Sequence, residues 1–173
     1  VCFISAGLTC LLYFLMGVNP FDSHANLFLF TWMGDLTSVL MLTPLILGWS
    51  NRIVENKSAV KLTELLVVFV LIVFVGCFIF LDWLPALYHF KKAYVTLPIL
   101  LWVTFRFNIR ETVTAIAFAS IIAILGTLKK HGPFSEVIFD EAFLGAQIYI
   151  SIICITILSL KSSLEELSYS KSE

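Results

Sequence analysis

The chain alternates between long apolar runs and short polar stretches. The apolar runs cover residues 1–18, 27–49, 65–81, 93–105, 112–128 and 142–160. A helix needs about 20 residues, with a range of about 17–25, to cross the hydrocarbon of a bilayer. Four of the runs reach that length unaided, 27–49 reaches it if one acid is tolerated, and 93–105 needs its flanking residues. The runs do not alternate apolar and polar positions with period 2, so they are not β-barrel strands.

We therefore predict an all-α fold, a polytopic transmembrane helix bundle with about six spans. The short run 93–105 leaves one alternative open at the fourth span. This segment either crosses the bilayer with help from the residues on both sides of it, or it is re-entrant.

Asp35 is the one ionisable side chain in the run 27–49. A carboxylate in so apolar a segment costs roughly 2.5–3.5 kcal/mol on insertion scales. A partner charge, a polar cavity or a task that requires the acid can offset that cost. A hydrogen-bonded acid with a purely structural role in the bundle interior explains it equally well.

Composition agrees with an integral membrane protein. Hydrophobic residues make up 60% of the chain and charged residues 13%, against roughly 25% charged in soluble domains, and the mean hydropathy is +0.98. The basic residues are too few and too dispersed for a nucleic-acid surface. No HExxH, GxSxG or phosphate-binding glycine loop is present. We expect no enzymatic activity, no cofactor, no metal site and no nucleic-acid partner.

The basic residues also predict the orientation of the chain. With six spans and a cytoplasmic C-terminus, seven basic residues lie on the inner side and four on the outer side, which agrees with the positive-inside rule. Lys129 and Lys130 are exceptions to the rule. The inner set is Arg52, Lys57, Lys61, Arg106, Arg110, Lys161 and Lys171, and the outer set is Lys91, Lys92, Lys129 and Lys130.

The polar end of the chain suggests a second unit. We assign residues 1–160 to a transmembrane domain that lacks its first helices, because the chain opens inside an apolar run, and 161–173 to the start of a cytoplasmic signalling helix or linker. Leu160, Leu164 and Leu167 are spaced by four and three, as in a short coiled-coil seam. A solvated helix end without a signalling role gives the same pattern.

Three polar features remain within or beside the spans. Each has a plain explanation: Asp35 as an interior structural acid, Arg106 as an anchor at the inner end of a span, and the loop 129–134 as an ordinary turn. The side chains concerned are Asp35 with Ser38 one helical turn later, the cluster Trp102, Arg106, Asn108 and Arg110, and the turn Gly132-Pro133.

Taken in order, these features resemble the membrane-associated sensor (MASE) domain of the first class. That family precedes histidine kinases, diguanylate cyclases and related output domains in bacteria. The resemblance rests on a W-x-G-D segment followed by a proline, a P-x-x-x-W-x-x-x-R-F stretch, and a G-P-F loop ahead of the last helix. Here they are Trp32, Gly34, Asp35 and Pro44; Pro98, Trp102, Arg106 and Phe107; and Gly132, Pro133 and Phe134.

The order and approximate spacing of the motifs agree along nearly the whole chain, but there are departures. The family has about eight helices, and its early W-x-P-x-G type motif is absent here. Ser38 stands where family members often have glycine. Asn108 stands where a glycine usually follows the R-F pair, and we expect this exchange to be tolerated because both residues accept positive φ.

The resemblance implies an integral-membrane sensory input domain in the bacterial cytoplasmic membrane. It would pass a signal to a cytoplasmic output domain, a histidine kinase or a cyclic-di-GMP enzyme. The implied partners are the bilayer, the missing N-terminal helices, the output domain, a second copy of the chain and a membrane partner protein. The signal- or ligand-related candidates are Trp32, Gly34, Asp35, Ser38, Pro44, Trp102, Arg106, Asn108, Gly132, Pro133 and Phe134.

Within this set we hypothesise that Asp35 is a buried control point. Its partner would be Arg106 or a cation from a missing helix. Depth in the membrane opposes a simple bridge to Arg106, because Asp35 lies eight residues into its span from the outer side and Arg106 lies near the inner end.

Other functions stay open. The main alternative is a small transporter or ion-conducting component that uses Asp35, since intramembrane carboxylates often mark ion or proton paths. A purely structural membrane scaffold is a third reading. An external pH or metal sensor built on His24, His89 and His131 is conceivable, because all three fall in outer loops, but chance explains their shared side better.

Overall fold

The structure is a computed structural model that describes residues 1–17, 24–50, 59–80, 93–134 and 139–170. Within these ranges the chain forms helices and no strands, which confirms the predicted all-α class. A short 3₁₀ turn, η2 (Ala93–Val95), leads into the fourth helix. The six α-helices are α1 (Cys2–Leu15), α2 (His24–Ser50), α3 (Ala59–Phe80), α4 (Thr96–Arg106), α5 (Ile109–Leu128) and α6 (Phe139–Ser170).

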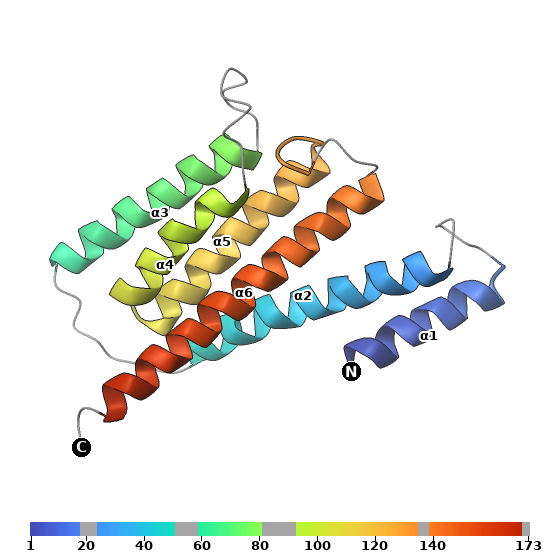
Figure 1. The fold of residues 1–173 in the computed structure, drawn as a ribbon, viewed down its shortest axis with the longest axis horizontal. Helices are drawn as coiled ribbons and strands as arrows, with labels where there is room; N and C mark the ends of the chain where they lie inside the picture. Colours follow the sequence, from blue (N-terminus) through green and yellow to red (C-terminus); the bar gives the residue numbers. More distant parts are fainter. Residues whose placement is uncertain (18–23, 51–58, 81–92, 135–138, 171–173) are drawn as a thin grey trace.

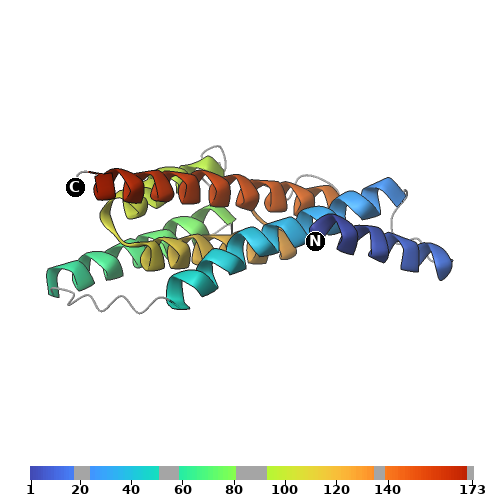
Figure 2. The same cartoon turned by 90° about the horizontal axis from the view of Figure 1, so that it is seen from below.

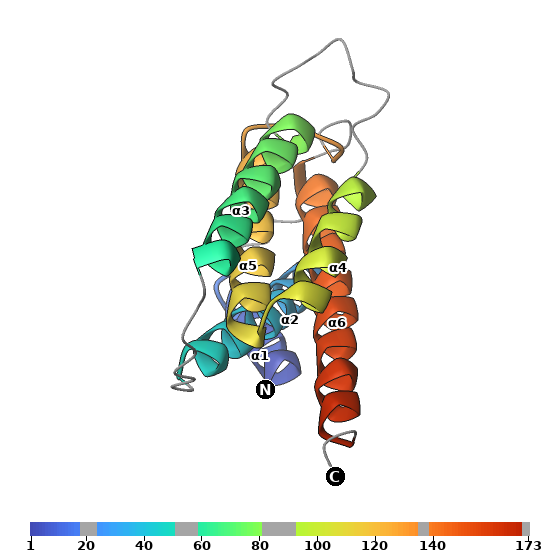
Figure 3. The same cartoon turned by 90° about the vertical axis from the view of Figure 1, so that its left-hand side faces the viewer.

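Helices α3, α4, α5 and α6 lie side by side as the body of the molecule (Figure 1). Two pairs form the layers of this body, α3 with α5 and α4 with α6, as an end-on view shows (Figure 3). Helix α2 packs across α5 and α6, and α1 packs against α2 at the edge of the molecule (Figure 2). The ring of Phe3 in α1 meets that of Phe28 in α2 edge to face, with centroids 5.1 Å apart.

Helix α5 is the centre of the bundle, because most of its residues are buried. Its interior positions are largely Ala, Ser, Thr and Gly, which let neighbouring backbones approach closely, as in other membrane bundles. The tightest approach is at Gly126, where an added Cβ would lie 2.3 Å from the carbonyl oxygen of Phe80 in α3. This crossing therefore requires glycine.

Large apolar side chains are exposed on the outer faces of all six helices. In water such a surface would aggregate, but lipid chains solvate it. Phe3, Phe74, Phe105, Phe118 and Ile152 are examples.

Among the described residues, four helical segments are long and apolar enough to cross a membrane: Ala25–Ser50, Thr63–Phe80, Ile109–Leu128 and Glu141–Leu167. The fourth predicted span is short, as expected, with 11 residues in α4 after η2. The first is shorter than its apolar run suggested, because α1 ends at Leu15 and Gly17 adopts a left-handed φ of 65°. The helical-bundle class is confirmed, and the two shorter apolar helices, Cys2–Leu15 and Ala93–Arg106, fall below the length of the four candidate spans.

Candidate functional site

The W-x-G-D segment faces α6 near the middle of α2. An added Cβ on Gly34 would lie 3.2 Å from Nε2 of Gln147. The absence of a side chain at Gly34 therefore leaves space for the Gln147 side chain. One turn further along α2, the hydroxyl of Thr37 lies 2.9 Å from the hydroxyl of Ser151 and 3.2 Å from the carbonyl oxygen of Gln147. Polar groups therefore join α2 to α6 inside an otherwise apolar bundle.

Sequence reasoning missed Thr37, Gln147 and Ser151. Gln147 and Ser151 are four residues apart and so share a face of α6, and Thr37 follows Gly34 by one turn. That spacing of polar residues within apolar runs was the available signal. It could not show that the two polar faces meet.

Two buried side-chain oxygens of α2 and α6 have no hydrogen-bond partner among the described residues. They are Oδ2 of Asp35 and Oε1 of Gln147. Such atoms are rare in folded proteins, and each calls for an explanation such as backbone strain, a functional role, or a bound water or ion. The hydroxyl of Ser38 offers no help, because it donates within α2 to the carbonyl oxygen of Gly34 at 2.8 Å.

The suggested pairing of Asp35 with Arg106 is wrong. Arg106 ends α4 and forms a two-pronged ion pair with Glu64 of α3, with Nε–Oε2 and Nη2–Oε1 distances of 2.9 Å each. The depth argument explains this outcome, since the two residues belong to different levels of the bundle.

A cavity of about 280 Å³ opens between α2, α5 and α6 beside Gln147. Most of its lining is apolar, with the Gln147 amide and two hydroxyls as polar points. The lining residues are Gly34, Thr37, Ser38, Met41, Ile124, Phe143, Ala146, Gln147 and Ile150.

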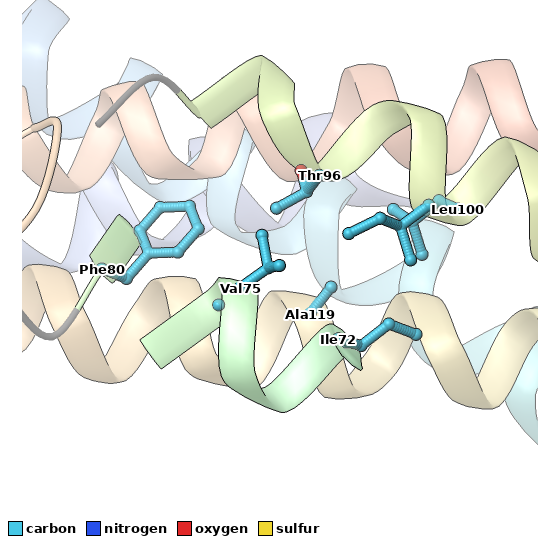
Figure 4. Close-up of a pocket in the computed structure, with 8 residues that line it drawn as sticks. Ile72, Val75, Phe80, Thr96, Leu100 and Ala119 are labelled. Atoms are coloured by element: carbon cyan, nitrogen blue, oxygen red, sulfur yellow. The ribbon is translucent and has the colours of Figure 1, made fainter. Parts of the chain in front are cut away.

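A second void lies between α3, α4 and α5, where Phe80, Thr96 and Leu100 point toward one another (Figure 4). Its volume of about 10 Å³ holds at most one water molecule. This void is a packing gap and not a candidate binding site.

The turn between α4 and α5, residues 106–110, forms what we call the α4–α5 corner. Lys161 of α6 is only 8% exposed there, and its ammonium group donates to the carbonyl oxygen of Phe107 at 2.6 Å. The carbonyl oxygen of Thr104 lies 3.4 Å from the same nitrogen. A cation at a helix C-terminus satisfies carbonyls that have no helical donor and interacts favourably with the helix dipole.

The same corner is tied to α2 through its other side. Nε of Arg110 donates to the carbonyl oxygen of Gly48 at 3.0 Å, and the indole nitrogen of Trp49 donates to the hydroxyl of Thr114 at 3.1 Å. With the Arg106 ion pair to α3 and the Lys161 contact to α6, the corner joins five helices.

Two predicted candidates at or near this corner behave differently from expectation. Asn108 is the N-cap residue of α5 with φ −77° and ψ 172°, so no positive φ is needed where the family often has glycine. Its side chain makes no capping hydrogen bond, and this extended backbone is open to any residue, so the position does not require glycine. Trp102 is 46% exposed on the outside of α4, away from the corner contacts described above.

At the opposite end of the bundle, the G-P-F loop folds back onto α3 and α6. Gly132 is buried with φ 88°, and an added Cβ would lie 3.0 Å from Cα of Phe80. Phe134, which follows Pro133, stacks on Phe80 with centroids 6.4 Å apart and lies 5.9 Å from the ring of Tyr149. The loop therefore closes this end of the bundle.

Tyr149 extends this closure to the start of α4. Its hydroxyl donates to the carbonyl oxygen of Ala93 at 3.0 Å and is hydrogen-bonded to the hydroxyl of Thr96.

Helix α5 ends in a Schellman motif. The backbone N–H of His131 donates to the carbonyl oxygen of Gly126, and Lys130 adopts a positive φ of 57°.

The remaining candidates are spread along α2. Trp32 is half-buried, and Pro44 lies inside the helix, where its ring removes the donor for the carbonyl of Leu40. The structure thus places most candidates in three separate regions, the α2–α6 contact, the α4–α5 corner and the G-P-F loop, and leaves Pro44 and Trp102 outside them.

Metal binding has no support in the described residues, where no three His, Cys, Asp or Glu side chains are grouped to hold an ion. His89 and the side chain of His24 lie outside the described residues. Of the three histidines in the sensor hypothesis, the structure therefore describes the side chain of His131 alone.

The fold and these contacts define a class: a helical membrane domain whose last helix leaves the bundle as a polar extension. Comparison with protein families gives the particular member of that class. The family model MASE1 matches residues 1–167, so the chain belongs to the MASE1 family, and the resemblance seen in the sequence is confirmed. This family comprises membrane sensory input domains of signalling proteins, which are not themselves catalytic. Searches of curated proteins and of solved structures found no match.

Proposed function

We propose that this domain passes a sensory signal through α6 to a cytoplasmic output domain, a histidine kinase or a cyclic-di-GMP enzyme. One observation carries the proposal: α6 takes part in every candidate region. It lines the cavity with Gln147, holds the α4–α5 corner with Lys161, and continues as a polar helix to Ser170.

The Lys161 contact is suited to such coupling because it is sensitive to position. A buried ammonium group is costly unless its hydrogen bonds are made, and at 2.6 Å the bond to the carbonyl of Phe107 has little room for movement. A shift of α6 by about 1–2 Å, the size of helix movements in allosteric transitions, would break it. We propose that signalling switches the bundle between two arrangements, with the bond made and with the bond broken.

The charges at the corner support an inner-membrane location with the C-terminus in the cytoplasm. Arg106, Arg110 and Lys161 lie at the end of the bundle from which the polar part of α6 emerges. Positive residues favour the cytoplasmic side. A homodimer through the extension of α6 and a membrane partner protein are further parts of the proposal.

A phase experiment tests the coupling. Residues 1–173 are fused to a diguanylate cyclase reporter, and one to four alanines are inserted between Ser162 and Ser163, both exposed in α6. Each insertion turns the following helix by about 100°. We expect cyclase activity to vary with helical period and to recover nearly fully with four alanines.

The same insertions placed before Cys2 serve as the control, because they lengthen the chain without turning the output. Equal activity across the whole α6 series would contradict coupling through a continuous helix.

A second candidate, an ion-conducting component, is favoured by one observation. Oδ2 of Asp35 is buried without a hydrogen-bond partner among the described residues, as expected for a carboxylate that binds a travelling ion or proton. Proton and sodium flux into liposomes that contain the chain, compared with Asp35→Asn, tests this alternative. Flux that exceeds empty liposomes and disappears in Asp35→Asn would favour it over the sensor.

A further inference from the structure

We propose that the cavity between α2, α5 and α6 binds a small lipophilic molecule with one hydroxyl group, held by the side-chain amide of Gln147. Binding of this molecule is independent of the proposed function. Its role as the signal rests on that function.

The Gln147 amide is the reason to expect a ligand. The residue is 7% exposed and lines the cavity, and its Oε1 has no hydrogen-bond partner among the described residues. The bond to Thr37 uses the backbone carbonyl of Gln147, so it leaves the amide unused. An unsatisfied buried polar group costs the folded protein its desolvation free energy, and a ligand oxygen would remove this cost.

The neighbouring polar groups do not compete for the amide. The hydroxyls of Thr37 and Ser151 lie 2.9 Å apart and bond one another. The hydroxyl of Ser38 bonds the carbonyl of Gly34. Gln147 therefore provides the polar anchor. Its Oε1 is an acceptor, so a ligand hydroxyl satisfies it by donating its hydrogen.

The rest of the cavity selects an apolar body. Met41, Ile124, Phe143 and Ile150 supply most of the remaining wall. A volume of about 280 Å³ lies at the lower end of ligand pockets. The lining and the size together point to a medium-chain alcohol, or a small ring with one hydroxyl group, which partitions into the bilayer before it binds.

The position of the cavity connects occupancy to α6. Gly34, Thr37 and Met41 come from α2, and Gln147 and Ile150 come from α6. A ligand between these helices therefore favours one α2–α6 packing over another. Its effect on the equilibrium equals its difference in affinity for the two packings.

The test uses a photoactivatable octanol that carries a diazirine, with the purified chain in nanodiscs. We expect photolabel on cavity residues of α2 and α6, identified by peptide mass spectrometry, and we expect 1-octanol to compete while n-octane competes about tenfold less well. This ratio corresponds to the loss of one hydrogen bond. The comparison needs no variant and so cannot fail through misfolding.

Variants then locate the site. Gln147→Met keeps the chain length and removes the amide, so we expect about tenfold weaker competition by 1-octanol. Met41→Trp fills the cavity and should abolish the labelling, whereas Leu42→Trp, at a neighbouring exposed position, should leave it unchanged. Equal competition by octane, or by octanol in Gln147→Met, would overturn the proposal in favour of a groove for lipid chains. Label spread over the outer helix faces would also overturn it.

The two proposals fail separately. Loss of octanol specificity, with helical-phase dependence of the cyclase reporter intact, would remove the ligand class and leave the sensor. Specific octanol binding without phase dependence would remove the coupling through α6.

Discussion

The ammonium group of Lys161 lies 2.6 Å from the carbonyl oxygen of Phe107 and connects the last helix to the corner between α4 and α5. The two residues are 54 positions apart in the chain. Because Lys161 is almost fully buried, solvent gives the contact little competition. It is the clearest place at which movement of α6 changes the rest of the bundle.

Replacement of Lys161 by methionine should destabilise the domain by about 1–3 kcal/mol, because the carbonyl of Phe107 then lacks its donor. Reaction of the buried Cys154 thiol with a fluorescent dye during heating reports unfolding. Lys129→Met, at an exposed lysine, is the matched control and should change little. In the cyclase fusion, Lys161→Met should also fix the output at one level. Normal regulation in this variant would exclude Lys161 from the coupling.

Substitution of Gly126 by alanine should disrupt the α3–α5 crossing, since the new Cβ would lie 2.3 Å from the carbonyl oxygen of Phe80. Backbone has to move to relieve this overlap, and overpacking of this kind costs about 1–3 kcal/mol or more. Gly7→Ala is the control, because nothing lies within 4 Å of the added atom. Thermal midpoints of the two variants give the comparison. Equal midpoints would mean that α3 and α5 are further apart than described.

Gly132 and Gly17 both have positive φ, 88° and 65°, but they differ in surroundings. Gly17→Ala should cost only the left-handed backbone penalty of about 1–2 kcal/mol, because no atom lies within 4 Å of its added Cβ. Gly132→Ala should cost more, because its Cβ would also meet Cα of Phe80 at 3.0 Å. The difference in melting temperature isolates the contact of the G-P-F loop with α3. A larger loss in Gly17→Ala would be inconsistent with that contact.

Exchange of Asp35 for asparagine tests the control-point hypothesis. Removing a carboxylate from the apolar span relieves an insertion cost of up to roughly 2.5–3.5 kcal/mol, so stability should be unchanged or raised while the reporter output changes. Glu166→Gln, at an exposed position of α6, controls for loss of one negative charge. The hypothesis fails if both the melting temperature and the output match those of the wild-type chain.

The ion pair of Arg106 with Glu64 is partly exposed, with side chains 51% and 31% accessible. Exposed pairs contribute little because water and salt screen them. We expect Arg106→Gln to lower the melting temperature only slightly, with the difference shrinking further at high salt. The charge-swapped double variant Arg106→Glu with Glu64→Arg should restore the midpoint. A large, salt-independent loss in Arg106→Gln would assign this arginine a second role.

The apolar runs were enough to predict the helices, because hydrophobic length determines what a bilayer accepts. The short fourth run predicted the short α4 for the same reason. The rotation of each helix about its axis was not predictable, since the few polar residues in these runs do not show which neighbouring helix each face meets. From the sequence, Lys161 could be interpreted only as one of the positive charges on the inner side. Its burial against the α4–α5 corner is known from the structure.

The same limit applies to the candidate site. The sequence motifs predicted Gly34 as a candidate, and the structure shows that it gives Gln147 room. Gln147 could not be identified as a site residue in the same way, because that requires knowing which face of α6 contacts α2. Asp35 was recognisable as a candidate because a carboxylate in an apolar span costs free energy on insertion. Its separation from Arg106 followed from the different depths of the two residues in the membrane.

Pro44 lies between two fixed points of α2. On one side, Thr37 is bonded to α6, and on the other, Gly48 and Trp49 are bonded to α5. The missing amide hydrogen of the proline makes the helix softer in bending between them. The first half of α2 can thus tilt together with the part of α6 that is bonded to Thr37, while the second half stays fixed to α5, so neither set of bonds has to break.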